Sequence, residues 1–564
     1  MLNSKTPGVM NKIKNLFVIV FVLGLSSQCS ELIQEENKSN PLADTYYRTR
    51  DGFESLINSN YASLREVYDL PWLFEAGTDM YVQGRSDGQP ESLSEYRNLT
   101  PLDPNVLTFY SSCYRAIQRA NTALYYMDLT EPTDVLTSRR GEIKFLRAYY
   151  YFLLVQQFGG VAIVTESFDL PATDFPRNAA EEVYAFVIRE MGEALALVPE
   201  TQAQNGRIIK RAVQHYLALA HLTRGYEAFA APGDFAQAAS YADAAIKGQA
   251  LTISFKDLFW PGKEKNAEVL LAIQFDKTSM QNLQNDGNNQ NAFFGPYLGG
   301  EGAARGYPYR TYTLCPTKYV FDLFTKDDVR FEGTFMLTIY DRYYDFYDRD
   351  GATAGLNVAV YYAPSWETDA ATWRAADPAR RAAAVFVPYA QTWEASSSSL
   401  DRATPGVRKF DDPTSIFTAS TNGNSTRDLY LARLGETYLI AAEAYLKAGD
   451  ATKAMDRINA VRKRAERTPG VLQITNPAAV TIDFILDERA RELVGEYHRW
   501  MDLKRTGKLV ERNVAFNTPL KTKWVNKGHD PFLGSDGELK LLRPIPQNAI
   551  DLNTADVKQN PGYQ

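Results

Sequence analysis

The chain has 564 residues, of which 45% are hydrophobic and 23% are charged, and this is the ordinary balance of a folded globular protein. Its net charge of −7 argues against a nucleic-acid partner, because phosphate binding requires a basic surface. The length allows a large hydrophobic core and several domains' worth of chain.

The amino-terminus has the pattern of a secretory signal. Two lysines precede an apolar run, Leu16–Leu25, which is shorter than the roughly 20 residues that span a bilayer. Cys29 follows closely and is the expected lipid acceptor, so we expect a signal peptide over 1–28 and a lipidated tether over 29–43. Gln28 departs from the small residue usual before such a cysteine, and an unmodified Cys29 after ordinary cleavage is the alternative.

Helical periodicity dominates the chain up to about residue 250 and returns after residue 427. The spacing of apolar residues predicts helices over 106–127, 139–158, 180–198, 208–230, 234–247, 427–448, 450–466 and 480–505. The sequence therefore predicts a mainly α fold, with a helical scaffold at about 44–250 and 427–510 and a tail over about 511–564.

Two stretches share a weak internal repeat of small residues at matching offsets. They are Gly233, Ala238 and Ala245 in the first stretch, and Gly449, Ala454 and Val461 in the second. Small residues allow paired helices to approach closely, and Leu434-Gly435 followed by Tyr438 fits the first helix of a tetratricopeptide repeat. The scaffold is therefore predicted to be an irregular tetratricopeptide-like solenoid of helix pairs.

Residues 251–426 differ in character from the helical stretches. They are rich in Gly, Asn, Ser, Pro and aromatic residues, with short strand-like runs such as Glu268–Phe275. We interpret this segment as one large loop-rich excursion between helix pairs. Long loops on a rigid scaffold often carry binding function, so the ligand-binding insert is expected here.

Aromatic residues make up 12% of the chain, with 34 Tyr, 29 Phe and 7 Trp. Tyr and Trp combine a flat apolar face with a polar edge, which suits sugar rings that show C–H groups on a face and hydroxyls at the edge. Most of these residues are expected in the core and only a few against a ligand.

Five segments, taken in order, resemble the SusD/RagB family of nutrient-binding outer-membrane lipoproteins. They are CSELIQEENKSN with TRDGFESLINSNYASLR, CYRAIQRANTALYYM with RGEIKFLRAYYYFLLVQQFGGVAIVTE, DLYLARLGETYLIAAEAYLKAGD, ILDERARELVGEYHRWMDLKRTGKL, and RPIPQNAID with NPGY. The resemblance implies a single SusD-like domain over 44–564, with four tetratricopeptide-like helix pairs. It also implies a SusC-like TonB-dependent transporter as partner, a lipid-anchored place at the cell surface, and capture of oligosaccharide, or of peptide, without cleavage.

Two groups of residues are candidates for ligand contact. Gly-flanked tyrosines and later tryptophans can expose a ring to ligand, or can pack their own loops: Tyr297, Tyr307, Tyr309, Tyr312, Trp366, Trp373 and Trp393. Family resemblance also points to Asp79, Tyr81 and Arg85, where a carboxylate and a guanidinium beside a ring can bind hydroxyls. A structural Asp–Arg pair is the equal alternative for these last residues.

The sequence indicates neither a cofactor nor a metal. Cys29, Cys113 and Cys315 fit no zinc or redox spacing, and whether one pair forms a disulfide stays open. The acidic stretch 341–351 fails the EF-hand pattern and is expected to be a solvated turn.

Two other classes of function stay open. The group His498, Arg499, Trp500 and Asp502 has helical spacing, so ion pairs and core packing explain it without catalysis. Carboxylate pairs for glycoside hydrolysis are spatial and invisible in sequence, so a surface glycoside hydrolase is one alternative. A helical-repeat scaffold that binds only protein is the other.

Overall fold

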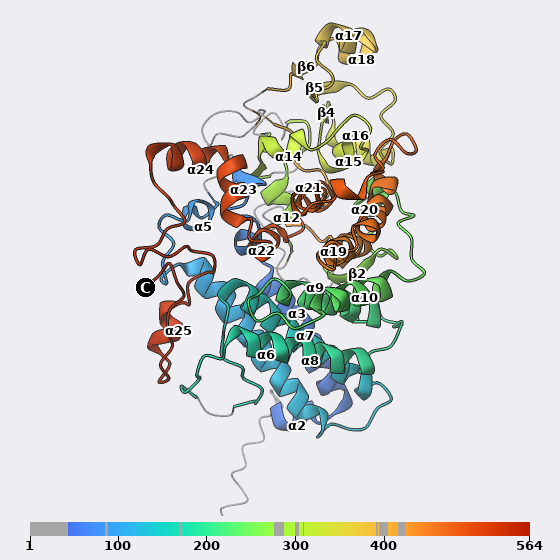
Figure 1. Ribbon diagram of the computed structural model, residues 1–564. Helices are drawn as coiled ribbons and strands as arrows, with labels where there is room; N and C mark the ends of the chain where they lie inside the picture. The colour runs from blue at the N-terminus through green and yellow to red at the C-terminus, as the bar shows by residue number, and fades with distance from the viewer. Residues whose placement is uncertain are drawn as a thin grey trace, which may run out of the picture.

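The structure is a computed structural model, and it describes residues 43–84, 88–168, 172–275, 287–298, 304–307, 310–390, 393, 404–415 and 424–564. The predictions for Cys29, Arg85 and Tyr309 fall outside these residues. The fold is mainly α, as predicted, with the helical scaffold at one end and the short elements of the insert, residues 251–426, at the other (Figure 1).

The scaffold is a row of helices in which each packs against the next. Its helices pack in four pairs: α3 (Arg50–Val67) with α6 (Pro104–Met127), α7 (Leu136–Phe158) with α8 (Ala180–Leu197), α9 (Lys210–Arg224) with α10 (Asp234–Ile246), and α19 (Leu434–Lys447) with α20 (Ala451–Ala465). Because α10 packs directly on α19, the row continues across the insert. The predicted tetratricopeptide-like scaffold is confirmed.

Local sequence explains where these helices begin and end. Asp103 caps α6 by accepting hydrogen bonds from two amides of the first turn, and Pro104 fits that turn because no amide is needed there. Helix α7 is buried from Phe145 to Phe158, a stretch that is largely apolar and aromatic, and it ends at Gly159 with φ of 71°.

The repeated small residues lie at helix contacts. Ala238 and Ala245 on α10, and Ala454 and Val461 on α20, are all fully buried. The lack of bulk at these positions lets each helix lie close to its partner, as the repeat predicts.

The structure corrects three helix predictions. Residues 429–433 form a strand, β7 (Leu429–Arg433), because they pair with β2 (Val269–Ile273); a short buried apolar run does not reveal its period. The helix predicted over 480–505 is two helices, α21 (Ile482–Glu492) and α22 (Arg499–Arg505), separated by Gly495 and Tyr497 with positive φ. The helix predicted over 208–230 ends at Arg224.

The insert is built from short elements. Its strand β3 (Leu314–Pro316) pairs with β1 (Tyr81–Gln83), which lies before α6 in the chain. Strands β4 (Thr338–Tyr340), β5 (Val358–Tyr362) and β6 (Val385–Val387) form a three-stranded sheet. Its helices are α11 (Phe255–Leu258), α12 (Gln290–Phe294), α14 (Lys318–Asp322), α15 (Arg330–Thr334), α16 (Tyr343–Asp348), α17 (Ala370–Ala375) and α18 (Pro378–Arg381).

The remaining elements flank the scaffold. They are α2 (Ala43–Tyr47), α4 (Trp72–Glu75), α5 (Glu91–Glu95), η1 (Pro477–Ala479), α23 (Leu509–Phe516), α24 (Thr518–Lys523), η2 (Val525–Lys527) and α25 (Gln547–Asp551). The tail folds back onto the scaffold, where the Arg543 guanidinium lies 4.4 Å from the centre of the Trp500 ring.

The two described cysteines decide whether they form a disulfide with each other. Cys113 and Cys315 are both buried free thiols, so they do not pair with each other.

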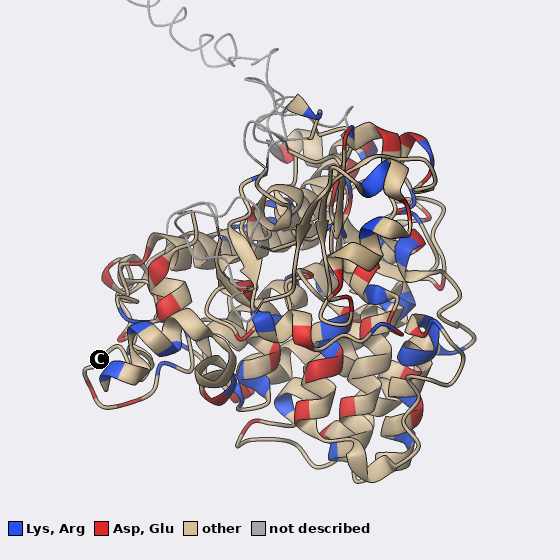
Figure 2. Cartoon of the chain, turned by 90° about the horizontal axis from the view of Figure 1, so that it is seen from above, with Lys and Arg blue, Asp and Glu red and all other residues tan. Residues whose placement is uncertain are grey.

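Acidic and basic residues are interspersed along the helices seen in Figure 2. Within the described part of the chain, no helix combines the length and apolar character needed to cross a bilayer.

Candidate ligand-binding site

A cavity of about 760 Å³ lies in the insert, which is within the usual range for a small-molecule site. Its walls come from α11, α15, α16, β4, β5 and the α17–α18 turn, with two side chains from residues 408–409 and one from α20. Nine aromatic residues line it: Phe255, Phe259, Trp260, Phe335, Tyr340, Phe346, Tyr347, Tyr361 and Trp373.

These rings form two groups. Around Trp260, the Phe346 and Tyr347 rings lie with their centres 5.5 Å from the indole. In the second group, the Tyr361 ring stacks on Trp373 with 4.5 Å between centroids and 9° between planes. The cavity therefore combines aromatic faces with polar and charged groups, and the Tyr347 and Tyr361 hydroxyls in it donate to Asp411 and Glu367.

Cations lie over five of these rings, Phe255 and Phe259 among them. The Arg408 guanidinium is 4.3 Å from the centre of Phe346, Arg381 is 4.8 Å from Trp373, and the Lys256 ammonium is 4.8 Å from Trp260. Cation–π contacts of this kind hold both partners in a defined position.

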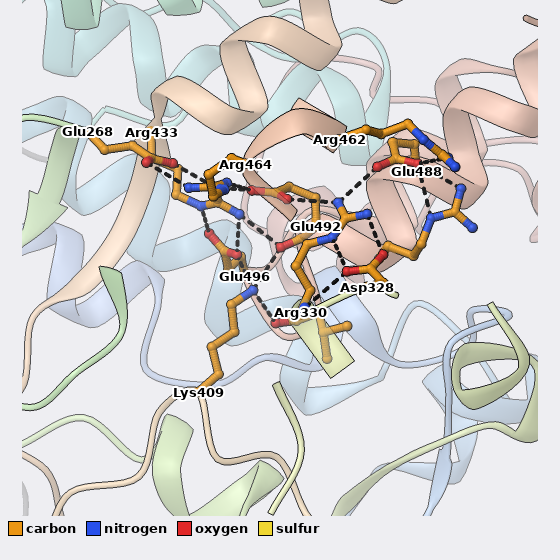
Figure 3. Close-up of polar contacts among 12 residues, drawn as sticks. Glu268, Asp328, Arg330, Lys409, Arg433, Arg462, Arg464, Glu488, Glu492 and Glu496 are labelled. Carbon is orange, nitrogen blue, oxygen red and sulfur yellow. Dashed lines mark hydrogen bonds and ion pairs between the residues drawn. The ribbon is translucent and has the colours of Figure 1, made fainter. Parts of the chain in front are cut away.

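Lys409 and Arg464 line the cavity and also belong to a network of buried ion pairs (Figure 3). At its centre, Arg433 binds Glu268 at 3.1 Å and both Glu492 and Glu496 at 2.6 Å. Lys409 pairs with Glu496, and Arg464 pairs with Glu268 at 2.9 Å.

The network also joins the insert to the scaffold. Arg330, on α15 of the insert, reaches Glu488 at 2.8 Å and Glu492 at 3.0 Å on α21. Because buried charges must be paired, these contacts fix the insert against α20 and α21. The base of the cavity is thus tied to the helical scaffold.

Burial and charge shift the pKa values of this network in opposite directions. Burial alone would raise the pKa of Glu488, but the guanidiniums of Arg491, Arg330 and Arg462 outweigh it and hold the pKa at about 2. Burial lowers the pKa of Lys409 to about 8, although Glu496 acts to raise it.

The structure buries Asp79 and Tyr81. Both Asp79 carboxylate oxygens accept 2.7 Å hydrogen bonds from Arg499, and Arg512 donates to one of them at 2.8 Å. The Tyr81 hydroxyl accepts from the Gly495 amide at 2.6 Å. This arrangement favours the structural alternative, with Arg499 and Arg512 as the partners of Asp79.

The predicted tyrosines lie in different settings. Tyr307 is buried, and its hydroxyl accepts from the Tyr340 amide at 2.8 Å. Tyr312 is also buried and shares a 2.7 Å hydrogen bond with Thr404. Tyr297 is half-buried against Val82 and Tyr312. None of the three lines the cavity.

The predicted tryptophans differ in the same way. Trp373 lines the cavity, whereas Trp393 is buried and donates to the Pro388 carbonyl at 3.1 Å. Trp366 keeps 39% of its surface exposed and packs its ring on Phe331, beside the cavity-lining Glu367. Of the predicted aromatic residues that the structure describes, Trp373 alone therefore lines the cavity.

Sequence reasoning missed Trp260 and Tyr361. Trp260 follows a short helix in a turn, W-P-G, which is a signal for an exposed aromatic in a loop. Tyr361 belongs to strand β5, VAVYY, whose half-buried residues Val358 and Tyr361 both line the cavity. No local pattern brings these two segments together.

The motifs that could suggest chemistry are structural. The stretch 341–351 contains the short helix α16, with Tyr343 and Phe346 buried, where a solvated turn was predicted. His498 is half-buried near Glu436, and Asp502 pairs with Arg489 at 2.6 Å. No group of three or more His, Cys, Asp and Glu within the described ranges could hold a metal ion.

Helix pairs packed in a row, with a large insert before the last pair, define the class as a helical-repeat protein. Residues 267–563 match the model of the SusD family, and residues 37–226 match a model described as starch-binding and associating with the outer membrane. The chain belongs to the SusD family.

Relatives extend this similarity over most of the chain. A SusD-like protein P38 from Formosa agariphila is 25% identical, over 89% of this chain and 93% of the relative. The starch-binding protein SusD of Bacteroides thetaiotaomicron is 27% identical, over 78% of this chain and 76% of the relative. The solved structure of a laminarin-binding SusD-like protein has the same fold, with a TM-score of 0.66 and 22% identity, covering 92% of this chain and 100% of the other.

Proposed function

We propose that this protein binds oligosaccharide in the insert cavity, at the outer surface of the outer membrane, and passes it unaltered to a SusC-like TonB-dependent transporter. The observation that carries the proposal is the cavity of about 760 Å³ with nine aromatic lining residues. Relatives named for binding starch and laminarin support a glycan as ligand.

The chemistry of the cavity supports saccharide capture. Aromatic rings offer apolar surface to the C–H faces of a sugar, and lining side chains such as Lys256, Asp377 and Arg380 offer hydrogen-bonding groups to its hydroxyls. A few rings and hydrogen bonds give modest affinity, which suits a protein that must release its ligand to a transporter.

The proposal is tested by titrating oligosaccharides into the soluble form that begins at Ser30. Trp260→Ala and Tyr361→Ala are each expected to weaken binding about ten-fold, because truncating an aromatic anchor costs on the order of 1–2 kcal/mol. The matched control is Tyr125→Ala, since Tyr125 is 56% exposed on the scaffold helix α6 and should leave affinity unchanged.

Three outcomes would contradict the proposal. Equal affinity in all variants would show that the ligand binds outside this cavity. Binding of peptides alone would show that the cargo is peptide and not oligosaccharide. Release of shorter sugars by the pure protein would establish the glycoside hydrolase alternative, and full recovery of intact ligand after incubation is the expected result.

Lipid attachment at Cys29 is the proposed anchor, because the cysteine follows a signal-like segment. Cys29→Ala is expected to move the protein from the membrane fraction to the soluble fraction, because the acyl chains that hold it there are missing. Fractionation identical to the unsubstituted protein would refute lipid anchoring.

A further inference from the structure

The cavity has an excess of cations that the whole molecule does not share. Among the described residues, four cationic lining residues form no ion pair with a carboxylate: Lys256, Arg380, Arg381 and Arg408. The lining carboxylates that likewise lack a cationic partner are Glu367 and Asp377, whereas Glu332 pairs with Arg467 at 3.0 Å. The local charge is therefore positive in a chain whose net charge is −7.

Arg408 is the clearest of these cations. Its amide donates to the Thr334 carbonyl at 2.7 Å, which fixes the backbone beside the cavity. Its guanidinium stacks on Phe346, and its Nε is buried with no hydrogen-bond partner in the part of the chain that the structure describes. A buried donor without a partner carries a cost of about 1–3 kcal/mol, so this position is suited to a ligand that accepts hydrogen bonds.

The stacking geometry leaves donors for a ligand. A guanidinium that lies over a ring uses its flat face and keeps its N–H groups at its edge, where a carboxylate or a sulfate can accept two of them. Arg381 has the same arrangement over Trp373, with one nitrogen donating to the Trp373 carbonyl at 2.9 Å. Arg380 donates to Asn357 at 3.1 Å and is exposed on α18.

We infer that this cavity selects anionic oligosaccharides, with a uronate carboxylate or a sulfate group bound by Arg408 and the neighbouring cations; the inference rests on the proposed function. A neutral sugar meets the hydrogen-bond needs of Arg408 but leaves the charge excess uncompensated. An acidic group does both, and the aromatic rings beside the cations limit their hydration and so strengthen the attraction.

The test compares three oligosaccharides of equal length: neutral, uronate-bearing and sulfated. At least one anionic ligand is expected to bind about ten- to hundred-fold more tightly than the neutral one, because charged hydrogen bonds are the stronger ones. Its affinity should fall as salt rises from about 50 to about 500 mM, while neutral binding stays nearly constant. The arm that binds more tightly identifies carboxylate or sulfate as the source of charge.

Substitutions locate the effect. Arg408→Gln and Arg380→Gln are each expected to weaken anionic binding, about ten-fold for Arg408, and to change neutral binding less than about two-fold. Arg380 serves where Arg408→Gln disturbs folding, since it lies on the surface of a short helix. Arg189→Gln is the matched control, because Arg189 also lies over a phenylalanine, 5.2 Å from Phe186, but on scaffold helix α8.

The outcomes separate this inference from the proposed function. Equal affinity for neutral and anionic ligands, without salt dependence, would overturn the inference and leave saccharide capture intact. Unchanged anionic binding in both arginine variants would also overturn it. Binding of an acidic peptide with no saccharide binding would overturn the inference and the proposed function together.

Discussion

At the scale of single residues, buried charge sets both stability and its pH dependence. Glu488 contacts Arg330, Arg462 and Arg491, and its pKa of about 2 is far below that of an exposed carboxyl group. Charge alternation in the sequence predicts ion pairs here, and the structure has them. The sequence does not predict that one partner of Glu488, Arg330, comes from the insert, because Arg330 lies more than 150 positions before Glu488.

The depressed pKa of Glu488 makes the fold sensitive to acid. The folded state holds fewer protons than the unfolded state, so this contribution is full above pH 4.5 and is lost as pH falls toward about 2. The loss is on the order of 3 kcal/mol in the free energy of unfolding. Chemical denaturation at several pH values measures it.

Two variants check the assignment. Glu488→Gln is expected to lower stability at neutral pH and to flatten the acid-induced loss, because the titrating group is gone and three guanidiniums are left under-compensated. Asp44→Asn, which removes an exposed pair with Arg48, should change stability by less than about 1 kcal/mol. An unaltered acid profile in Glu488→Gln would refute the account.

At the scale of elements, the sequence predicts helices well and their interruptions poorly. Apolar spacing finds α6, α8, α10 and α20 nearly to their ends. It misses β7, because strand identity depends on pairing with β2, more than 150 residues earlier. It also misses the break between α21 and α22, where Tyr497 has a φ of 65° that no local signal in a non-glycine residue announces.

Glycines at helix ends give a sharp test at this scale. Gly449 has φ of 89°, and a Cβ there would meet nothing within 4 Å, so any cost of Gly449→Ala is conformational. We expect the free energy of unfolding to fall by about 1–2 kcal/mol, measured by denaturant titration.

Gly192 provides the matched control. It lies inside α8, and a Cβ there also has open space. Gly192→Ala is therefore expected to stabilise the protein by about 0.5–1 kcal/mol, because alanine loses less backbone entropy in a helix. The same sign for both substitutions would contradict this explanation.

At the scale of the whole molecule, the cavity is formed by segments that lie far apart in the sequence. Its lining comes from residues 254–261, 329–381 and 408–409, with Arg464 from α20. The sequence places a ligand-binding role in the insert and names aromatic residues as contacts. It cannot rank them, because exposure of a ring such as Trp260 depends on how separate loops pack.

The fold explains why one insert can carry specificity on a common scaffold. Because α10 packs on α19, the row of scaffold helices is continuous although the insert separates them in sequence. The buried ion pairs of Arg330, Arg433 and Arg464 fix the insert to this scaffold. Changes at the cavity rim can then alter the ligand without altering the scaffold.

The central claim is that oligosaccharide binds in the insert cavity. The most direct measurement is a crystal structure of the soluble form with a saccharide that it binds in solution. The account predicts sugar density against Trp260 and Tyr361, with any acidic group at Arg408. Sugar density confined to another surface, with this cavity holding only water, would contradict it.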